Sequence, residues 1–208
     1  MPSTSHAILT DPEFLVPPVP DHDGSSPDGV AWLRSCVARF SSGADHRRRR
    51  ALAVAELAPI APESLRLRAA ERGDGPVEVL TEALGLSADV ADDVAVVAKS
   101  YQPHTAITEE ADRAVARLVE ACGGVADEAT ANRIGLLVQA CDATKALVAN
   151  TVAGRTGPPV PLTRRVAPDG TLVEVSLTQV PFGIGPHACP GRAHALALAA
   201  GLVDARTR

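Results

Sequence analysis

The sequence predicts a mainly helical fold that carries one small β-hairpin, and three observations support this. Apolar residues recur at helical spacing through most of residues 29–153. The core must be aliphatic, because 46% of the 208 residues are apolar while Trp32, Tyr101 and three phenylalanines are the only aromatic residues. Near the C-terminal end, an Asp169-Gly170 turn stands between valine-rich runs within 162–178, which is typical of a short hairpin.

Residues 1–29 are expected to form an extended N-terminal segment, and residues 30–208 one domain. Residues 11–29 carry five prolines among aspartate, glycine and serine, a composition that favours loops. Helical periodicity then predicts several helices, with Ser87 and Thr108 as capping candidates. Their expected ranges are 29–41, 45–57, 62–72, 76–85, 88–100, 108–122 and 126–153. A break rich in glycine and proline follows, and the alanine- and leucine-rich run 192–203 predicts a last, buried helix.

Charge and composition favour a soluble, cytoplasmic protein. The net charge of -5 gives no general reason to expect nucleic acid binding. The first residues lack a basic start and a long apolar run, and the apolar stretch from Ile134 is interrupted by Asp142 and Lys145. We therefore expect no export signal and no contact with a membrane. The four cysteines show neither CxxC spacing nor a disulfide pattern, which favours a reducing compartment.

Residues Phe182–Gly191 read F-G-I-G-P-H-A-C-P-G and place an aromatic residue, glycines, a histidine and a thiol at set spacings. The glycines lack a Cβ atom, so they permit positive φ angles and a close approach of the backbone. Pro190 suits the first turn of the helix that follows. The positive N-terminal end of that helix is expected to lower the pKa of the Cys189 thiol and to make the thiolate its resting form.

This loop resembles the cysteine-ligand loop of the cytochrome P-450 family. The resemblance implies a truncated cytochrome P-450-like helical fold and a heme b cofactor (iron protoporphyrin IX). It implies that the Cys189 thiolate is the axial ligand of the iron, with backbone N–H groups tuning its potential. Phe182, Gly185, His187 and Gly191 would shape the loop around the cofactor. Two alternatives remain: Cys189 is a small buried hydrophobe, or it shares a metal ion with His187 and His194.

The segment Phe40–Arg50, F-S-S-G-A-D-H-R-R-R-R, looks like the family helix that carries H-x-x-x-R on the proximal side of heme. His46 and Arg50 match these positions and share one helical face, where two donors can bind a propionate. Without the family, the arginines indicate a solvated basic face or an anion-binding patch. The three arginines between His46 and Arg50 could steer a ferredoxin-type electron donor to the protein, or could simply be solvated.

Residues 161–170, P-L-T-R-R-V-A-P-D-G, look like the family strand that carries an arginine to the other propionate. Arg165 fits best, and Arg164 is the alternative. His187, two residues before the thiol, matches a further propionate partner. With His46 and Arg50, these residues would surround two carboxylates from separate parts of the chain, although each alone could be an ordinary surface residue.

The predicted helix 126–153 resembles the family's distal helix, where an acid and a threonine handle dioxygen and protons. Thr144 matches the alcohol, but Cys141 replaces the family glycine and Ala143 occupies the acid position. Asp142 lies one residue early, about 100° around the helix. Thr144 and Asp142 are thus the candidate catalytic residues. The alternative is that the Thr144 hydroxyl only bonds the preceding helical turn.

The chain lacks part of the family pattern. Cys189 follows Thr144 by 45 residues, with no Glu-x-x-Arg between them, whereas family members are about twice this length and carry that motif there. Glu63 and Arg66 have the spacing but precede the distal helix, so they predict an ordinary helical pair. Residues 74–87 resemble the segment that leads into a leucine-glycine-leucine turn. The resemblance therefore runs in order, with gaps, from about residue 9 to the end.

These patterns predict a heme-thiolate oxidoreductase that carries out monooxygenase-like oxidation of a small apolar substrate. It would use dioxygen plus an electron donor, or peroxide, and the absent acid beside Thr144 favours peroxide. The alternative is a non-catalytic, cytochrome P-450-like heme-binding sensor or interaction protein with an open, wet distal side. Loss of covering structure would expose apolar surface, which a second copy of the chain could bury as a homo-oligomer.

Overall fold

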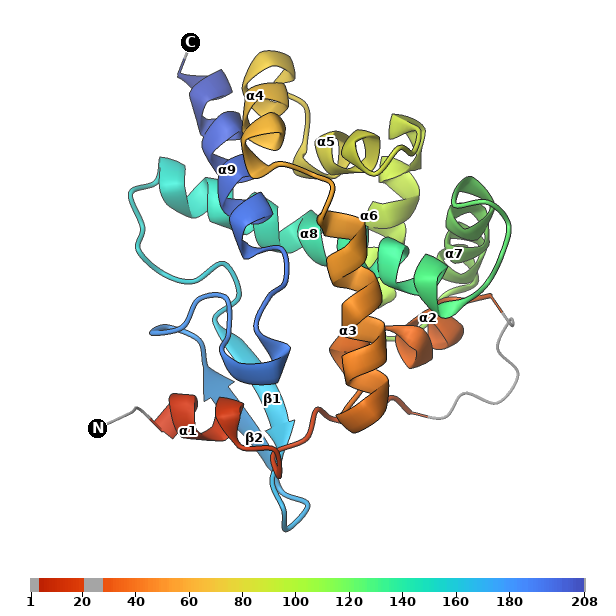
Figure 1. Ribbon diagram of the computed structural model, residues 1–208, viewed down its shortest axis with the longest axis vertical. Helices are drawn as coiled ribbons and strands as arrows, with labels where there is room; N and C mark the ends of the chain where they lie inside the picture. Colours follow the sequence, from red (N-terminus) through yellow and green to blue (C-terminus); the bar gives the residue numbers. More distant parts are fainter. Residues whose placement is uncertain (1–3, 21–27, 208) are drawn as a thin grey trace.

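Helix α8, Glu128–Val152, crosses the middle of the helical part of the protein, and most other helices pack against it (Figure 1). The computed structural model describes residues 4–20 and 28–207. The other α-helices of these ranges are α1 Thr4–Thr10, α2 Val30–Cys36, α3 Gly43–Leu57, α4 Pro62–Arg72, α5 Pro76–Ala83, α6 Ala91–Ser100, α7 Glu109–Ala121 and α9 Arg192–Arg206. Three short 3-10 helices join them: η1 Ala38–Phe40, η2 Ala88–Val90 and η3 Gly185–His187.

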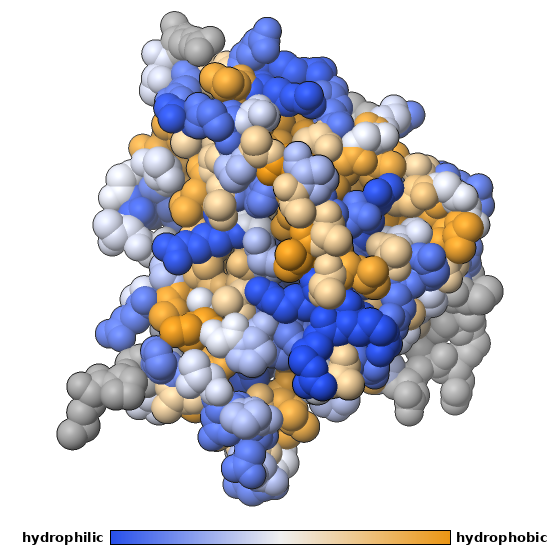
Figure 2. Space-filling model, in the orientation of Figure 1, coloured by the Kyte–Doolittle hydropathy of each residue, from blue (hydrophilic) through white to orange (hydrophobic). Residues whose placement is uncertain are grey.

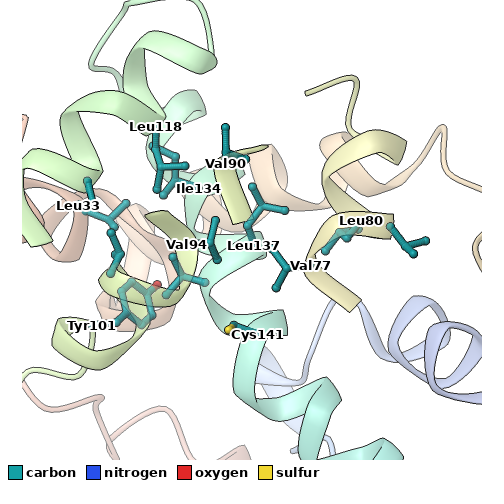
Figure 3. Close-up of a cluster of buried hydrophobic side chains, with 14 of the residues drawn as sticks. Leu33, Val77, Leu80, Val90, Val94, Tyr101, Leu118, Ile134, Leu137 and Cys141 are labelled. Atoms are coloured by element: carbon teal, nitrogen blue, oxygen red, sulfur yellow. The ribbon is translucent and has the colours of Figure 1, made fainter. Parts of the chain in front are cut away.

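The core is aliphatic, as the composition predicts, and it packs against one face of α8 (Figure 3). Ile134, Leu137 and Cys141 of α8 are almost fully buried against side chains such as Val94 of α6 and Leu118 of α7. These positions are three or four residues apart, so they lie on one face of the helix. The opposite face of α8 is left free for the site described below.

The start of α8 is fixed by polar contacts that the sequence reading missed. The Asp127 carboxylate accepts a hydrogen bond from the Thr130 backbone N–H at 2.8 Å and caps the helix. The Glu128 carboxylate then accepts hydrogen bonds from Arg48 and Arg49 of α3 at 2.7–2.8 Å. These bonds hold α3 across the first turn of α8.

A second set of hydrogen bonds holds the loop after α6 against α2. Arg34 is 3% exposed and donates to the carbonyl oxygens of Gln102 at 2.6 Å and Thr105 at 2.9 Å. Its burial lowers the pKa of the guanidinium, while the charge of Asp112 opposes this effect. The loop that follows α6 therefore has a fixed position relative to α2 and η1.

The predicted hairpin is present and forms a small lobe with the N-terminal segment (Figure 1). Strands β1, Leu162–Val166, and β2, Leu172–Ser176, pair antiparallel around a turn in which Gly170 has a φ of +84°. Leu15 bonds to Val166 through both backbone groups, at 2.8 and 3.0 Å. Leu9 of α1 packs on β2 in a second, smaller apolar cluster.

Most predicted helices agree with the structure apart from their ends. The predicted helix 29–41 is interrupted at Val37, whose backbone is extended, and so becomes α2 and η1. Helix α9 continues three residues past the predicted end, to Arg206. Thr108 caps α7 as predicted, because its hydroxyl accepts from the Ala111 N–H at 3.1 Å. The backbone carbonyl of Ser87, the other capping candidate, lies at the start of η2 and accepts from the Val90 N–H.

The N-terminal segment departs from the extended conformation expected for 1–29, because residues Thr4–Thr10 form α1. This short helix is held by the contacts of Leu9 with the hairpin lobe, which no local pattern of the sequence indicates. Residues 1–3 and 21–27 of the segment, and residue 208 at the other end, lie outside the described residues. None of the helices within 4–20 and 28–207 is both long and apolar enough to cross a membrane.

Helices α4 and α9 pack closely at a glycine. A Cβ atom on Gly201 of α9 would overlap the Arg66 carbonyl and lie 2.8 Å from Ala69 Cβ. The Arg66 side chain donates to Asp204 of α9 at 3.1 Å, so the predicted Glu63–Arg66 pair is wrong. Arg66 thus pairs with Asp204 on the neighbouring helix rather than with Glu63 on its own helix.

Gly201→Ala is therefore expected to lower the free energy of unfolding by about 2 kcal/mol, because overpacking outweighs the higher helix propensity of alanine. Urea denaturation followed by circular dichroism measures this. Gly157→Ala is the matched control, since an added Cβ there meets no atom within 4 Å. A Gly201→Ala protein as stable as wild type would contradict the close packing of α4 and α9.

Candidate functional site

A cavity of about 830 Å³ lies where the helical part meets the hairpin lobe. Its lining comes from α3, the free face of α8, the hairpin and the loop Phe182–Gly191. On α8 the lining includes Leu136, Ala140, Ala143 and Leu147, so this wall is apolar. The hairpin adds Leu162 and Leu172, which are 47% and 54% exposed. The volume falls in the range of about 300–1,000 Å³ that is usual for small-molecule and cofactor sites.

The loop Phe182–Gly191 is closed by its own backbone. The Cys189 N–H donates to the Phe182 carbonyl at 2.8 Å, and η3 forms one turn between them. Gly183 and Gly185 have φ angles of +69° and +72°, which explains why glycine occupies both positions. A Cβ atom on Gly185 would lie 2.6 Å from the Leu9 carbonyl, so this close approach is to α1.

Gly191 and Pro190 differ from the sequence expectation. The φ of Gly191 is -94°, and an added Cβ would make an ordinary contact of 3.5 Å with Leu57, so nothing here demands glycine. Helix α9 begins at Arg192, and Pro190 lies before it rather than in its first turn. The start of α9 at Arg192 is the one that the alanine- and leucine-rich run predicts.

The Cys189 side chain is accessible and lines the cavity. Burial among the surrounding protein atoms raises the pKa of its thiol, although the Gly191 backbone N–H and the charges of Arg50 and Arg39 oppose this effect. The prediction that the thiolate is the resting form is therefore wrong for the protein alone. Desolvation of the sulfur outweighs the nearby positive groups.

His46 and His187 stack inside the cavity wall. Their ring centroids are 3.9 Å apart with an interplanar angle of 37°. Burial and then the charges of Arg50, Arg47 and Arg165 lower the pKa of His46. Burial, His46 and nearby arginines lower the pKa of His187 to about 3. Both rings are therefore neutral at pH 7.

Two arginines from separate segments join this pair. Arg50 of α3 donates to the Ala188 carbonyl at 2.7 Å, next to Cys189. Arg165 of β1 is 6% exposed and donates to the Arg164 carbonyl at 2.8 Å and to the Thr163 hydroxyl at 3.2 Å. Burial lowers the pKa of Arg165, and the charge of Arg39 adds to this. Among the described residues, no carboxylate forms a salt bridge with either arginine.

Arg164 and Arg39 also line the cavity, in different ways. Arg164 is largely exposed and bonds Glu174 of β2 at 3.1 Å, so its charge is neutralised. Arg39 lies in η1, with its guanidinium carbon 5.7 Å from the Phe40 ring centroid. The sequence reading missed Arg39, although its place just before the His46 segment was a usable signal. The structure thus brings His46, Arg50, Arg165 and His187 to one cavity and adds Arg39.

The two candidate catalytic residues, Thr144 and Asp142, lie on different faces of α8. Thr144 is 2% exposed and lines the cavity, and no described residue accepts a hydrogen bond from its hydroxyl. Asp142 is exposed and lies outside the lining, while Cys141 belongs to the core. Ala143 lines the cavity where an acid was expected. Gln139, which the sequence reading missed, is also in the lining and donates to the Gly135 carbonyl at 2.9 Å.

The alternative of a metal ion shared by His187, Cys189 and His194 is wrong. Within residues 4–20 and 28–207, no three His, Cys, Asp or Glu side chains are grouped to hold a metal ion. His194 of α9 instead bonds the Ile60 carbonyl through Nε2 at 2.9 Å. This contact ties α9 to the loop between α3 and α4.

The arginine run of α3 is largely neutralised by acids. Arg48 bonds Asp45 and Glu128 at 2.7–2.8 Å, and Arg49 bonds Glu128 and the Ser41 hydroxyl. Arg47 is exposed. Figure 2 shows hydrophilic side chains gathered over this part of α3, but much of that charge is internally paired. The surface therefore offers less positive charge to an acidic electron donor than the sequence predicts.

Comparison with known proteins reveals the fold and little sequence similarity. No family model matches the chain, and no curated protein matches it. Among solved structures, it is similar to the crystal structure of P450BioI in complex with an acyl carrier protein ligated to hexadec-9Z-enoic acid. The TM-score is 0.67 at 15% sequence identity, and the match covers 97% of this chain and 81% of that chain. The chain has a cytochrome P-450-like fold. The resemblance of a few motifs thus corresponds to a shared, mainly helical fold with a small sheet.

Arg165→Met is expected to raise the free energy of unfolding of the heme-free protein by about 1 kcal/mol, because it removes a buried charge that has no acidic partner among the described residues. Chemical denaturation at pH 7 measures this. Arg164→Met is the control and should change stability by less than about 0.5 kcal/mol, since its pair with Glu174 is exposed. A destabilised Arg165→Met protein would mean that the cation already has a compensating partner.

Proposed function

We propose that the protein is a heme-thiolate oxidoreductase that oxidises a small apolar substrate in a monooxygenase-like or peroxygenase reaction. The observation that carries this proposal is that Cys189 shares one cavity with Arg50 and Arg165, neither of which pairs with a carboxylate among the described residues, and with an apolar wall. The cytochrome P-450-like fold supports the proposal.

The residues of the cavity fit heme b. A thiol suits ligation of the iron. Arg165 is buried and Arg50 is half-buried, and neither pairs with a carboxylate among the described residues, so both favour a ligand that brings negative charge. Heme carries two propionates, which would neutralise Arg50 and Arg165 through charge-assisted hydrogen bonds. His46 and His187, being neutral, would donate further hydrogen bonds to the same carboxylates.

Each part of the chain would then have a defined role. Bound heme would supply the activation of dioxygen or peroxide. Cys189 would lose its proton on binding the iron, as metal ligands must, and the Gly191 N–H would stabilise the negative sulfur. Phe182 and Gly185 would hold the loop in position, and the apolar face of α8 would orient the substrate and exclude water from it.

The α8 wall supports peroxide as the oxidant. With Asp142 outside the lining, the Thr144 hydroxyl is left without a neighbouring acid on its own helix to relay protons from solvent. Peroxide carries its own protons and both oxidising equivalents, so it needs neither this relay nor an electron donor. The paired arginines of α3 also favour peroxide, because a ferredoxin-type donor would find little free positive charge there.

The second candidate function is a non-catalytic heme-binding sensor or interaction protein. The outward position of Asp142 and the exposed Leu162 and Leu172 at the cavity favour it, because both would weaken proton control and water exclusion. The same exposed side chains support a homo-oligomer as the resting assembly. The similar P450BioI structure includes an acyl carrier protein, so a protein partner is a further proposal for this fold. The division of the chain at residue 29 also stays a proposal.

Heme-thiolate ligation is tested by loading the purified protein with heme and recording the carbon monoxide difference spectrum of the reduced form. Wild type should give the red-shifted Soret band of a thiolate ligand, and Cys189→Ala should lose it, since no other sulfur is in the described lining. Cys36→Ala is the control and should keep the band, because Cys36 is not among the lining residues. Identical spectra for wild type and Cys189→Ala would reject the proposal.

Peroxide-driven oxidation is tested by product formation from a small apolar probe such as styrene. The heme-loaded protein should turn over at least about tenfold faster with hydrogen peroxide than free heme, because the thiolate pushes electron density onto the iron. Asp142→Asn should leave this rate unchanged, since Asp142 does not line the cavity. A rate equal to that of free heme would favour the sensor or interaction protein.

A further inference from the structure

The α8 wall of the cavity is mostly apolar, but one of its side chains leaves a hydrogen-bond acceptor open. The wall includes Leu136, Ala140 and Ala143. Gln139 also lines the cavity, three residues after Leu136 and four before Ala143, so these side chains share one face of the helix. A carboxamide therefore lies within an otherwise apolar part of the lining.

The orientation of the Gln139 carboxamide is fixed by its own helix. Its Nε2 group donates to the Gly135 carbonyl at 2.9 Å. The end that meets a carbonyl oxygen must be the NH2 group, because two oxygens would repel each other, so Oε1 is the other end. In the part of the chain that the structure describes, no group donates to Oε1, and protein atoms do not enclose it. Gln139 thus presents an open acceptor at the cavity wall.

The other polar side chains near this wall differ from Gln139. The Asn132 carboxamide is fully used, since Oδ1 accepts from the Ala38 N–H at 3.0 Å and Nδ2 donates to two backbone carbonyls. The Thr144 hydroxyl can donate and accept, so it selects neither kind of partner. Gln102, on the loop after α6, forms no side-chain hydrogen bond with any described residue, so its amide can turn either end to a ligand. Within the lining of α8, Gln139 is therefore the residue that selects for a donor.

An open acceptor in an apolar wall favours a neutral ligand that carries a hydrogen-bond donor. A hydrocarbon or an ether lying over Gln139 would remove Oε1 from water and leave it unpaired, which costs free energy. An alcohol would replace the lost water with its own O–H group. Such a site discriminates between analogues with and without the donor more strongly than an apolar surface does.

We propose that Gln139 is a specificity-determining residue that accepts a hydrogen bond from the hydroxyl of an apolar alcohol. The hydrocarbon part of this alcohol lies on the apolar α8 wall, where its burial contributes affinity. The role of the alcohol as substrate rests on the proposed function, whereas its binding to Gln139 does not require heme. The hydrogen bond fixes one end of the substrate and so sets its direction along α8.

The proposal is tested by isothermal titration calorimetry of the heme-loaded protein with octanol and with heptyl methyl ether. These two ligands are isomers, and only octanol has an O–H donor. Octanol should bind about fivefold more tightly than the ether, as one net hydrogen bond implies. Gln139→Met keeps the length of the side chain and removes the acceptor, so it should abolish this preference. Gln179→Met makes the same change on an exposed residue outside the lining and should keep the preference.

The ether reports whether the cavity of the variant is intact. It needs no acceptor, so its affinity should be the same for wild type and Gln139→Met. If the variant bound neither ligand, nuclear magnetic resonance of the heme-free wild type would decide, because the chain has three glutamines, Gln102, Gln139 and Gln179. With carbon-13 in the side-chain carbonyls, the Gln139 signal should shift with octanol and much less with the ether.

Three results would overturn the assignment of Gln139. They are equal affinities of the two ligands for wild type, a preference for octanol that survives in Gln139→Met, and a Gln139 signal that octanol leaves unmoved.

Failure of this inference and failure of the proposed function give different results. The carbon monoxide spectrum of the same samples shows whether heme is bound through Cys189. A thiolate band without a preference for octanol overturns the role of Gln139 alone. If no thiolate band forms, the proposed function fails, and calorimetry of the heme-free protein decides about the binding site: a preference for octanol that depends on Gln139 supports it, and the absence of this preference overturns it.

Discussion

The two-sided packing of α8 is the constraint on which the other features depend. One face of this helix is buried in the aliphatic core through Ile134, Leu137 and Cys141, and the other face lines the cavity. Because the core fixes the rotation of the helix, it also decides which residues reach the cavity. Thr144 and Ala143 reach it and Asp142 does not. If the core held α8 in a different rotation about its axis, other residues of the helix would face the cavity. The packing of the core therefore decides which side chains are available to the site.

The ligand loop is positioned from the opposite side by the small lobe. Its bond from Cys189 to Phe182 and the positive φ angles of Gly183 and Gly185 give the loop its shape. Its place relative to α8 depends on α1, which approaches Gly185 closely, and on α9, which follows it. The cysteine is therefore held between the first and the last helix of the described chain.

The charges of the cavity oppose the stability of the protein without a ligand. Arg165 is buried and forms no salt bridge with a carboxylate among the described residues. A buried charge of this kind is unfavourable, and an anionic ligand would relieve it. The Cys189 thiol, whose pKa is raised by burial, stays neutral at pH 7 and would lose its proton only on binding a metal ion. Binding such a ligand would then stabilise the fold, so cofactor and stability are coupled.

The sequence by itself determined the helical class, most element ranges and the hairpin at Asp169-Gly170, because short stretches of chain encode periodicity and turn chemistry. The group formed by His46, Arg50, Arg165 and His187 was implied by the resemblance of separate motifs to the cytochrome P-450 family, and the fold brings these residues to one cavity. Tertiary structure alone decided the rest. Helix α1 exists through its contacts with the hairpin lobe, and Arg48, Arg49 and Arg66 found partners on other helices. The pKa of Cys189 and the position of Arg39 depend on burial and on neighbours far along the chain, which no local pattern contains.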